Sequence, residues 1–154
     1  MIELINFTEL KSQQIEEVFI WRNHPFIREN MINKGEIPFE KHLAFIHALQ
    51  DDRSRLYFYL QGPEGGIGVF DLVDICQTSA VFGCYKNPFL TKKGIGTKIM
   101  DIALDYSFHT LGLETLTLEV YRTNSVAIRL YEKMGFVVYD ETDILLKMKL
   151  DHHV

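Results

Sequence analysis

One stretch of the sequence, residues 80–106, limits the fold more than any other. Residues 80–85 have the composition of a strand, and a loop with lysine and glycine follows them. After this loop, apolar residues recur at steps of four and three, which is the pattern of an amphipathic helix. They are Ile95, Ile99, Ala103 and Tyr106. The sequence therefore predicts a strand that passes through a glycine loop into a helix, an arrangement typical of α/β proteins.

The loop itself, residues 88–98, has the features of an anion-binding site. The first N–H groups of a helix lack intrahelical partners, and the helix dipole adds partial positive charge there. Gly94 and Gly96 carry no Cβ, so an anion can approach the backbone, and Lys92 and Lys93 add full charges. We therefore expect a phosphate or pyrophosphate to bind here. The same order of elements also occurs as plain α/β architecture, and the loop matches neither the P-loop nor the dinucleotide-binding fingerprint.

A second motif follows a strand that is predicted at residues 115–120. It has the form Asn-x-x-Ala-x-x-x-Tyr-x-x-x-Gly-Phe and consists of Asn124, Ala127, Tyr131, Gly135 and Phe136. Gly94 and Gly96 are spaced as in an Arg/Gln-x-x-Gly-x-Gly/Ala loop, and the two motifs together resemble those of the GCN5-related N-acetyltransferases. One departure is that Thr91 and Lys92 stand where that family has Arg/Gln and Gly. Lys92 or Lys93 then has to supply the charge, as a point charge rather than a bidentate fork.

The resemblance covers nearly the whole chain and implies an α/β (α+β) architecture, the GNAT fold. In that fold a central mixed, mostly antiparallel sheet of about seven strands is flanked by about four helices, and two central strands splay apart. The predicted order of elements agrees, so we expect a single N-acetyltransferase domain over residues 1–154. The resemblance also implies acetyl-CoA as the cosubstrate, no metal, and direct attack by an acceptor amine in a ternary complex.

The family resemblance assigns acetyl-CoA contacts to three segments. The residues are Cys84, Tyr85, Lys86, Thr91, Lys92, Lys93, Gly94, Ile95, Gly96, Thr97, Asn124, Ala127 and Tyr131. Tyr131 matches the family's general acid, which protonates the departing thiolate, and a core tyrosine is the alternative. The backbone N–H near Tyr85 is the expected donor to the carbonyl oxygen as it gains charge. Asn124 is expected to cap its helix as well as to contact the cosubstrate.

Two carboxylates are candidates for the general base. Glu119 ends the strand before Asn124, which puts it near the point where the central strands part. Asp71, on a neighbouring predicted strand, is the second candidate and is also expected to contact the substrate. A carboxylate there could take a proton through water, whereas an acceptor amine of lowered pKa would need no dedicated base. A surface or structural role is the alternative for Glu119.

The N-terminal half of the chain contains segments that indicate which amine accepts the acetyl group. Parts of it resemble a branch of the family with ribosomal-protein N-terminal acetyltransferases and sugar-amine acetyltransferases. Within that branch, four segments are most similar to enzymes that acetylate the 4-amino group of UDP-4-amino-4,6-dideoxy-N-acetyl-β-L-altrosamine in pseudaminic acid biosynthesis, for flagellin and surface glycans. The segments are residues 22–25, the helix around His42 and Leu43, residues 85–90 and residues 131–133. This resemblance implies Arg22 and His42 as substrate-binding residues, with local pairing of Arg22 and packing of His42 as the alternatives.

Other acceptors and another class of protein stay open. A peptide N-terminus or a polyamine would fit an acidic cleft, which the net charge of −5 allows. Basic surroundings of Arg22 and His42 would instead favour a sugar nucleotide. A non-catalytic sensor that binds acyl-CoA is a third alternative, and the intact Tyr131 argues against it.

Bulk properties exclude several further classes. The net charge of −5 argues against general nucleic-acid binding. No apolar run is long enough to cross a membrane, and the N-terminus lacks the pattern of a signal peptide. We therefore expect a cytoplasmic protein with two free thiols, Cys76 and Cys84, and no metal-ligand spacing. The oligomeric state is not readable from the sequence, although homodimers are common in the family.

Overall fold

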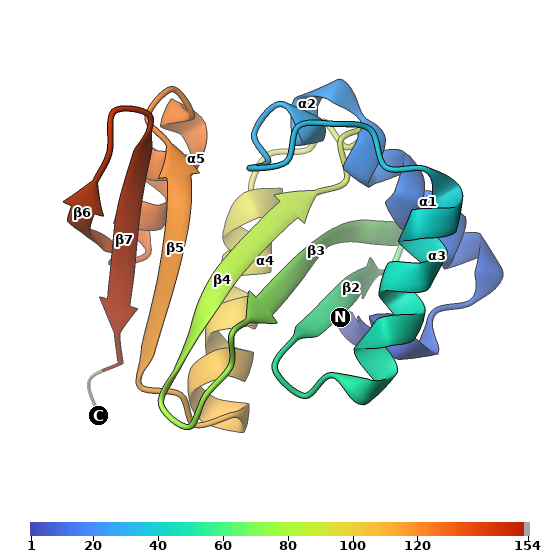
Figure 1. The fold of residues 1–154 in the computed structure, drawn as a ribbon, viewed down its shortest axis with the longest axis horizontal. Helices are drawn as coiled ribbons and strands as arrows, with labels where there is room; N and C mark the ends of the chain where they lie inside the picture. Colours follow the sequence, from blue (N-terminus) through green and yellow to red (C-terminus); the bar gives the residue numbers. More distant parts are fainter. Residues whose placement is uncertain (153–154) are drawn as a thin grey trace.

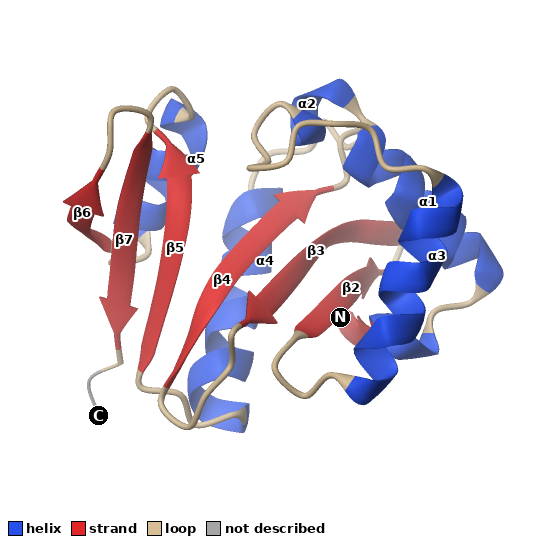
Figure 2. Ribbon diagram, in the orientation of Figure 1, coloured by secondary structure: helices blue, strands red, loops and turns tan. Residues whose placement is uncertain are grey.

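A mixed sheet organises the computed structural model, which describes residues 1–152 (Figures 1 and 2). Its strands are β1 (Glu3–Asn6), β2 (Leu56–Gly62), β3 (Gly65–Val73), β4 (Ser79–Lys86), β5 (Thr115–Tyr121), β6 (Val137–Glu141) and β7 (Leu145–Asp151). These seven strands of the described chain lie in the order β1-β2-β3-β4-β5-β7-β6. Every neighbouring pair is antiparallel except the parallel pair β4–β5. The predicted mixed, mostly antiparallel sheet is confirmed, and residues 153–154 of the predicted domain lie outside the described residues.

Five α-helices accompany the sheet in residues 1–152. They are α1 (Ser12–Asn23), α2 (Pro25–Arg28), α3 (Phe39–Ala48), α4 (Ile95–Asp105) and α5 (Ser125–Lys133). The sequence predicted about four helices, and the shortest of the five, α2, is a single turn. Pro25 separates α1 from α2 because a proline disfavours helical backbone at the residue before it, His24. Pro25 itself then suits the first position of the next helix.

The central strands β4 and β5 pair only at their beginnings. Their register runs from Ser79–Thr115 to Val81–Thr117, and no later pair joins them within residues 1–152. β4 stays bonded to β3, and β5 to β7, as the two strands diverge toward the top of Figure 1. The splayed central strands that the sequence predicted are therefore present, and the free strand edges face each other.

Side-chain alternation along β3 divides the core into two layers. Phe70 and Leu72 point toward α4 and α5, where the larger apolar cluster lies. Val69 points to the opposite face and packs with Trp21 of α1 in the smaller cluster. In Figure 2, α1 and α3 cover this second face over β2 and β3. Because successive residues of a strand alternate between faces, Asp71 shares the face of Val69.

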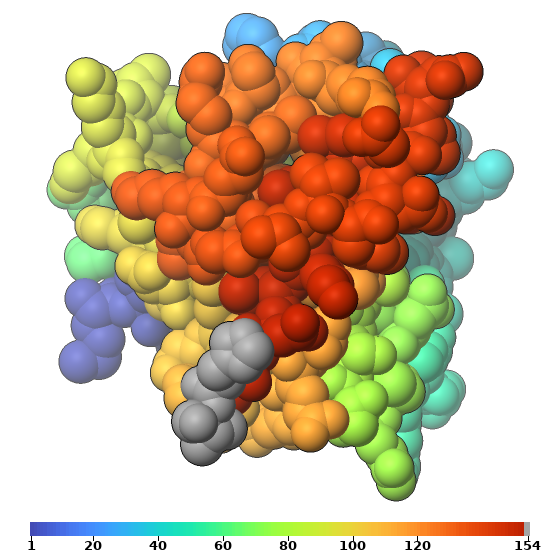
Figure 3. Space-filling view, turned by 90° about the vertical axis from the view of Figure 1, so that its left-hand side faces the viewer, coloured from blue at the N-terminus to red at the C-terminus, as the bar shows by residue number. Residues whose placement is uncertain are grey.

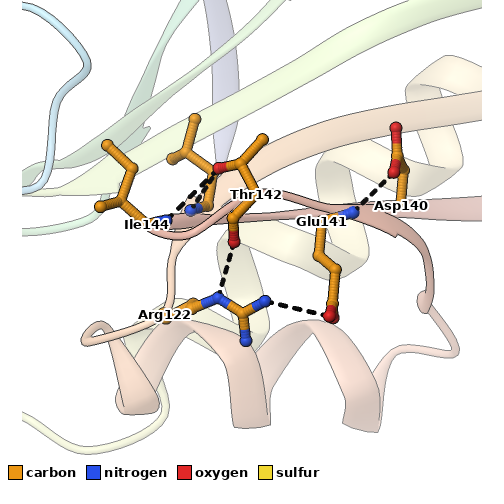
Figure 4. Close-up of polar contacts among 6 residues, drawn as sticks. Arg122, Asp140, Glu141, Thr142 and Ile144 are labelled. Carbon is orange, nitrogen blue, oxygen red and sulfur yellow. Dashed lines mark hydrogen bonds and ion pairs between the residues drawn. The ribbon is translucent and has the colours of Figure 1, made fainter.

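The β6–β7 hairpin completes the sheet beside α5, and Figure 3 shows this face of the molecule. Arg122, just after β5, donates from Nε to the Thr142 carbonyl oxygen at 2.9 Å. Its Nη2 lies 3.1 Å from Glu141 Oε1, so the guanidinium bridges the hairpin turn (Figure 4). The turn is thus tied to the short connection between β5 and α5, two residues before Asn124.

Candidate active site

The start of α4 is open to an anion. Gly94 precedes its first residue with φ +87°, in the left-handed region that glycine adopts without strain. No side chain in residues 1–152 caps this helix, so the N–H groups of its first turn have no side-chain partner. Lys92 and Lys93 are exposed on the preceding loop. This geometry suits a phosphate or diphosphate group.

Gly96 lies where α5 packs against the first turn of α4. A Cβ at Gly96 would approach Leu130 Cδ2 of α5 to 3.1 Å. Next to it, Lys133 Nζ donates to Thr97 Oγ1 at 3.4 Å. The sequence predicts that an anion approaches this glycine, and the structure adds a packing reason that no local pattern indicates.

The outer part of β4 offers a free backbone edge. Cys84, Tyr85 and Lys86 pair with β3, but they lie beyond the last pair with β5. Their edge toward β5 therefore has no strand partner in the part of the chain that the structure describes. An extended ligand can pair with such an edge as an additional strand would.

Tyr131 projects from α5 into the core at this opening. Its Oη lies 3.8 Å from Cys84 Sγ, and its side chain is buried. Burial, followed by the neighbouring Cys84, raises the pKa of the Tyr131 hydroxyl well above its ordinary value. The hydroxyl therefore keeps its proton at neutral pH and can donate it to a stronger base.

Asn124 holds the helix that carries Tyr131. Its Oδ1 accepts a hydrogen bond from the Ala127 N–H at 3.3 Å. The prediction that Asn124 caps this helix is therefore confirmed. Because Tyr131 lies two turns further along, the cap also fixes the direction in which the tyrosine enters the core.

Cys84 has the environment of a structural thiol. Burial raises the pKa of this thiol to about 12, despite a hydrogen bond with Tyr131 that opposes the shift. A thiol that stays protonated at neutral pH is a poor nucleophile. Cys76 is a free thiol as well, and it lies exposed in the connection between β3 and β4.

The two predicted carboxylates have different surroundings. Asp71 pairs with Tyr57 on β2 and with Gly83 on β4, and its side chain is surrounded by protein yet partly reached by solvent. Burial raises the pKa of the Asp71 carboxyl to about 7. Glu119 is exposed on β5, where it pairs with Lys147 of β7.

Arg22 of α1 presents a guanidinium group that is only partly satisfied. Its Nη2 donates to the Asn33 carbonyl oxygen at 3.0 Å, whereas Nη1 is buried without a hydrogen-bond partner in residues 1–152. Burial lowers the pKa of the guanidinium, and nearby Tyr85 and Tyr57 oppose this shift. An arginine remains cationic at neutral pH. A buried, unpaired N–H group of this kind can bind an anionic or carbonyl oxygen.

Residues 29–37, here called the strap, connect α2 to α3 without regular structure and run above β4 in Figure 1. Asn23 holds the end of the strap with two hydrogen bonds, from Nδ2 to the Ile37 oxygen at 2.9 Å and from the Ile37 N–H to Oδ1 at 2.8 Å. Tyr121, at the end of β5, donates to the Met31 oxygen at 3.3 Å. The strap thus links α1 to β5 across the diverging strands. No local sequence pattern predicts this role, because the hydrogen bonds of the strap join residues far apart in the chain.

His42 of α3 is buried and bonded within the protein. Its Nε2 lies 3.1 Å from the Ile15 oxygen of α1, and its ring packs against Phe19 and Phe39. Burial lowers the pKa of the His42 imidazole, although the bond to Ile15 opposes the shift. His42 therefore fixes α3 on α1, and only Nδ1 is left for a ligand.

Two features are absent from the described part of the chain. In residues 1–152, no group of three or more His, Cys, Asp or Glu side chains is arranged to hold a metal ion. Within the same residues, no helix combines the length and the apolar character needed to cross a membrane.

Known proteins resemble this chain in sequence and in fold. Residues 15–136 match the model of the acetyltransferase (GNAT) family. Acetyltransferase PseH of Campylobacter jejuni subsp. jejuni serotype O:23/36 (strain 81-176) is 45% identical over 141 residues, 92% of this chain and 88% of that protein. Spermidine N(1)-acetyltransferase of Escherichia coli (strain K12) is 31% identical over 123 residues, 79% of this chain and 61% of that protein.

A solved structure extends the similarity to the whole fold. The crystal structure of Campylobacter jejuni N-acetyltransferase PseH in complex with acetyl coenzyme A superposes with a TM-score of 0.84 and 37% sequence identity. The match covers 99% of this chain and 100% of that one. The protein therefore belongs to the acetyltransferase (GNAT) family, as the two sequence motifs predicted.

Proposed function

We propose that this protein transfers an acetyl group from acetyl-CoA to the 4-amino group of UDP-4-amino-4,6-dideoxy-N-acetyl-β-L-altrosamine, a step of pseudaminic acid biosynthesis. The observation that carries the proposal is the similarity, over nearly the full length, to PseH of Campylobacter jejuni, whose crystal structure contains acetyl coenzyme A. The reaction is assigned to the cytoplasm, in agreement with the expectation from the sequence.

The residues near α4 and β4 fit acetyl-CoA. The first turn of α4, from Ile95 to Thr97, offers backbone N–H groups to the diphosphate, and Lys92 and Lys93 offer charge. The free edge of β4 at residues 84–86 suits the extended amide-bearing arm. Asn124 and Ala127 lie at the start of α5, on the other side of the opening.

The chemistry assigned to this site is direct attack by the amine. Tyr131, whose hydroxyl is protonated at neutral pH, gives its proton to the departing thiolate. The N–H region of Tyr85 stabilises the carbonyl oxygen as it gains charge. Cys84 takes no covalent part, because its thiol stays protonated.

Arg22 is assigned to the diphosphate of the sugar nucleotide. Its buried Nη1 lacks a partner in residues 1–152, and an arginine is well suited to a phosphate oxygen. His42 stays a predicted substrate contact through Nδ1, with its Nε2 holding α1. Basic character at Arg22 favours an anionic acceptor over a cationic one.

A polyamine is the second candidate acceptor. The similarity to spermidine N(1)-acetyltransferase favours it, and so does the presence of Asp71 and Glu119 on one face of the sheet. A peptide N-terminus is a related cationic acceptor. A sensor that only binds acyl-CoA is disfavoured, because Tyr131 would then have no chemical role.

Thiol release from acetyl-CoA tests the acceptor. The panel holds the UDP-4-amino sugar, spermidine and a short peptide with a free N-terminus. The proposal predicts turnover with the sugar nucleotide and none above background with the other two. Turnover only with spermidine or the peptide would overturn the proposed acceptor. Binding of acetyl-CoA without any turnover would favour the sensor.

A further inference from the structure

Asp71 lies in the middle of a row of residues that crosses three strands. Its neighbours in the row are Tyr57 of β2 and Gly83 of β4. A Cβ built on Gly83 would lie 2.9 Å from Asp71 Oδ1 and 3.1 Å from Oδ2. The carboxylate therefore occupies the space above Gly83 that any other side chain would fill, and it extends toward β4 rather than β2.

Gly83 marks the place where the opening between β4 and β5 begins. The last pair of the two strands, at Val81, is two residues earlier, and Cys84 follows directly. Asp71 reaches this place from the face that carries α1, whereas Tyr131 reaches it from the face that carries α5. The Asp71 carboxylate is close enough to contribute to the raised pKa of the Tyr131 hydroxyl. A base on one face and an acid on the other suit an acceptor and a leaving group that meet in the opening.

The Asp71 carboxylate is free to contact a ligand. In residues 1–152, no hydrogen bond is donated to its oxygens, and no Lys, Arg or His nitrogen lies within ion-pair distance of them. The side chain is still partly reached by solvent. An ammonium group that enters from the α1 face would therefore find an unpaired carboxylate.

The titratable groups around Asp71 come from four elements. They are Tyr57 of β2, Cys84 and Tyr85 of β4, Tyr131 of α5 and, near the two tyrosines, Arg22 of α1. Burial raises the pKa of the three tyrosines and of the cysteine, so all four are neutral at pH 7. Arg22 keeps its positive charge. Of these groups, Asp71 alone changes charge near neutral pH, because burial raises its pKa to about 7. A base with a pKa near the working pH is the most effective.

We infer that Asp71 is the general base of the reaction, the group that takes a proton from the ammonium form of the acceptor. The inference rests on the proposed function. The proton moves from nitrogen to an Asp71 oxygen, and the freed lone pair forms the bond to the acetyl carbonyl carbon. The bond from that carbon to sulfur breaks, and Tyr131 protonates the sulfur. The surplus proton on the new amide nitrogen restores Tyr131, and Asp71 releases its proton to water.

Glu119 is the weaker candidate for this step. It lies on β5 and is exposed to solvent beside Lys147, its partner on β7. The Asp71 carboxylate lies in the space above Gly83, at the opening. No glycine of the described chain leaves such a space for the Glu119 side chain. Comparison of the two carboxylates therefore forms part of the test.

The test compares Asp71→Asn, Glu119→Gln and the control Asp74→Asn in thiol-release kinetics from about pH 5.5 to about pH 9.5. Asp74 is exposed with φ +50°, a conformation that asparagine also adopts, so the control makes the same chemical change away from the opening. We expect kcat/KM of the unaltered protein to rise through an ionisation near pH 7 and then level off. Asp71→Asn should lose that ionisation and about 100-fold in kcat/KM at neutral pH, with acetyl-CoA affinity by calorimetry unchanged. Asp74→Asn should keep both the ionisation and the kcat/KM of the unaltered protein.

Two results would overturn the inference. One is an Asp71→Asn variant with the ionisation intact and a rate close to that of the unaltered protein, and the other is loss of the ionisation in Glu119→Gln. Should Asp71→Asn fail to fold, Gly83→Ala keeps the carboxylate but displaces it, and a normal pH profile for this variant would also overturn the inference. Should the unaltered protein acetylate spermidine instead of the sugar nucleotide, the proposed acceptor is wrong. The same comparison with spermidine then still tests Asp71.

Discussion

At the scale of single residues, burial decides what each group of the site can do. Tyr131 and Cys84 are both deep in the protein, and their pKa values rise, so both stay protonated. For Tyr131 a retained proton is useful, because a thiolate needs one when it departs. For Cys84 the same effect removes reactivity. Tyr131 and Cys84 thus differ in role although they are in contact. A protonated Tyr131 can donate its proton to a ligand, whereas a protonated Cys84 cannot attack one.

Tyr131→Phe tests the assigned acid. Removal of the hydroxyl leaves the ring and its packing on Phe136 in place. We expect kcat to fall by about 100-fold, as is typical for loss of a general acid. Calorimetry should show acetyl-CoA affinity within a factor of about two of the unaltered protein, because the hydroxyl acts on the leaving group. Unchanged turnover would remove Tyr131 from the mechanism.

The raised pKa of Asp71 also predicts a pH-dependent stability that requires no substrate. The carboxyl ionises near its ordinary value of 3.8 in the unfolded chain but only at about 7 in the folded protein. Between these values the unfolded state loses the proton first, so this group lowers the free energy of unfolding as pH rises. Above about pH 7 the full cost is present, and below about pH 3.8 it vanishes.

Asp71→Asn should therefore stabilise the protein at high pH. We expect an increase in the free energy of unfolding on the order of 2 kcal/mol at about pH 8, reduced by the solvent that reaches the carboxylate, and none at about pH 3.5. Urea denaturation at the two pH values measures it. An equal effect at both values would show that the shift is absent.

At the scale of elements, the contact between α4 and α5 joins the loop to the helix that carries Tyr131. Gly96→Val should disturb this contact, since even a Cβ would meet Leu130 at 3.1 Å, and it should crowd the first turn of α4. We expect acetyl-CoA to bind at least about tenfold more weakly by calorimetry. Equal affinity would refute the assignment of this turn to the diphosphate.

The side chain of Asn23 holds the end of the strap. Asn23→Ala removes both hydrogen bonds to Ile37, at an expected cost of about 1 to 3 kcal/mol in the free energy of unfolding. We expect KM for the acceptor to rise while acetyl-CoA affinity stays the same, because the strap borders the α1 face. Asn30→Ala, which loses only an exposed bond to the Phe26 oxygen, is the matched control and should leave KM unchanged. A normal KM for Asn23→Ala would mean that the strap does not border the acceptor.

The elements that the sequence predicted well are those with a local signature. The strand, the loop at Gly94 and the helix after it follow one another within one short stretch, and the Asn124 cap forms between residues three apart. The position of the Asp71 carboxylate above Gly83 depends instead on the register of β3 and β4. The strap depends on hydrogen bonds such as that from Tyr121 to the Met31 oxygen. Such pairings join positions far apart in the chain, so the periodicity of the sequence does not predict them.

At the scale of the whole molecule, one parallel pair in an otherwise antiparallel sheet creates the site. Because β4 and β5 part after Val81, the sheet is open between its two halves, and both faces have access to the same place. The α4 and α5 face carries the open helix start and Tyr131, while the α1 face carries Asp71 and Arg22. Under the proposed assignment, acetyl-CoA and the acceptor amine enter this opening from opposite faces of the sheet.

The most direct measurement identifies the bond that the protein makes. Acetyl-CoA labelled with ¹³C at the carbonyl carbon is incubated with the UDP-4-amino sugar and the protein, and the product is examined by NMR. The account predicts a single new amide carbonyl signal that correlates with the sugar proton at C4. A carbonyl signal at a hydroxyl position, or no labelled sugar at all, would contradict it.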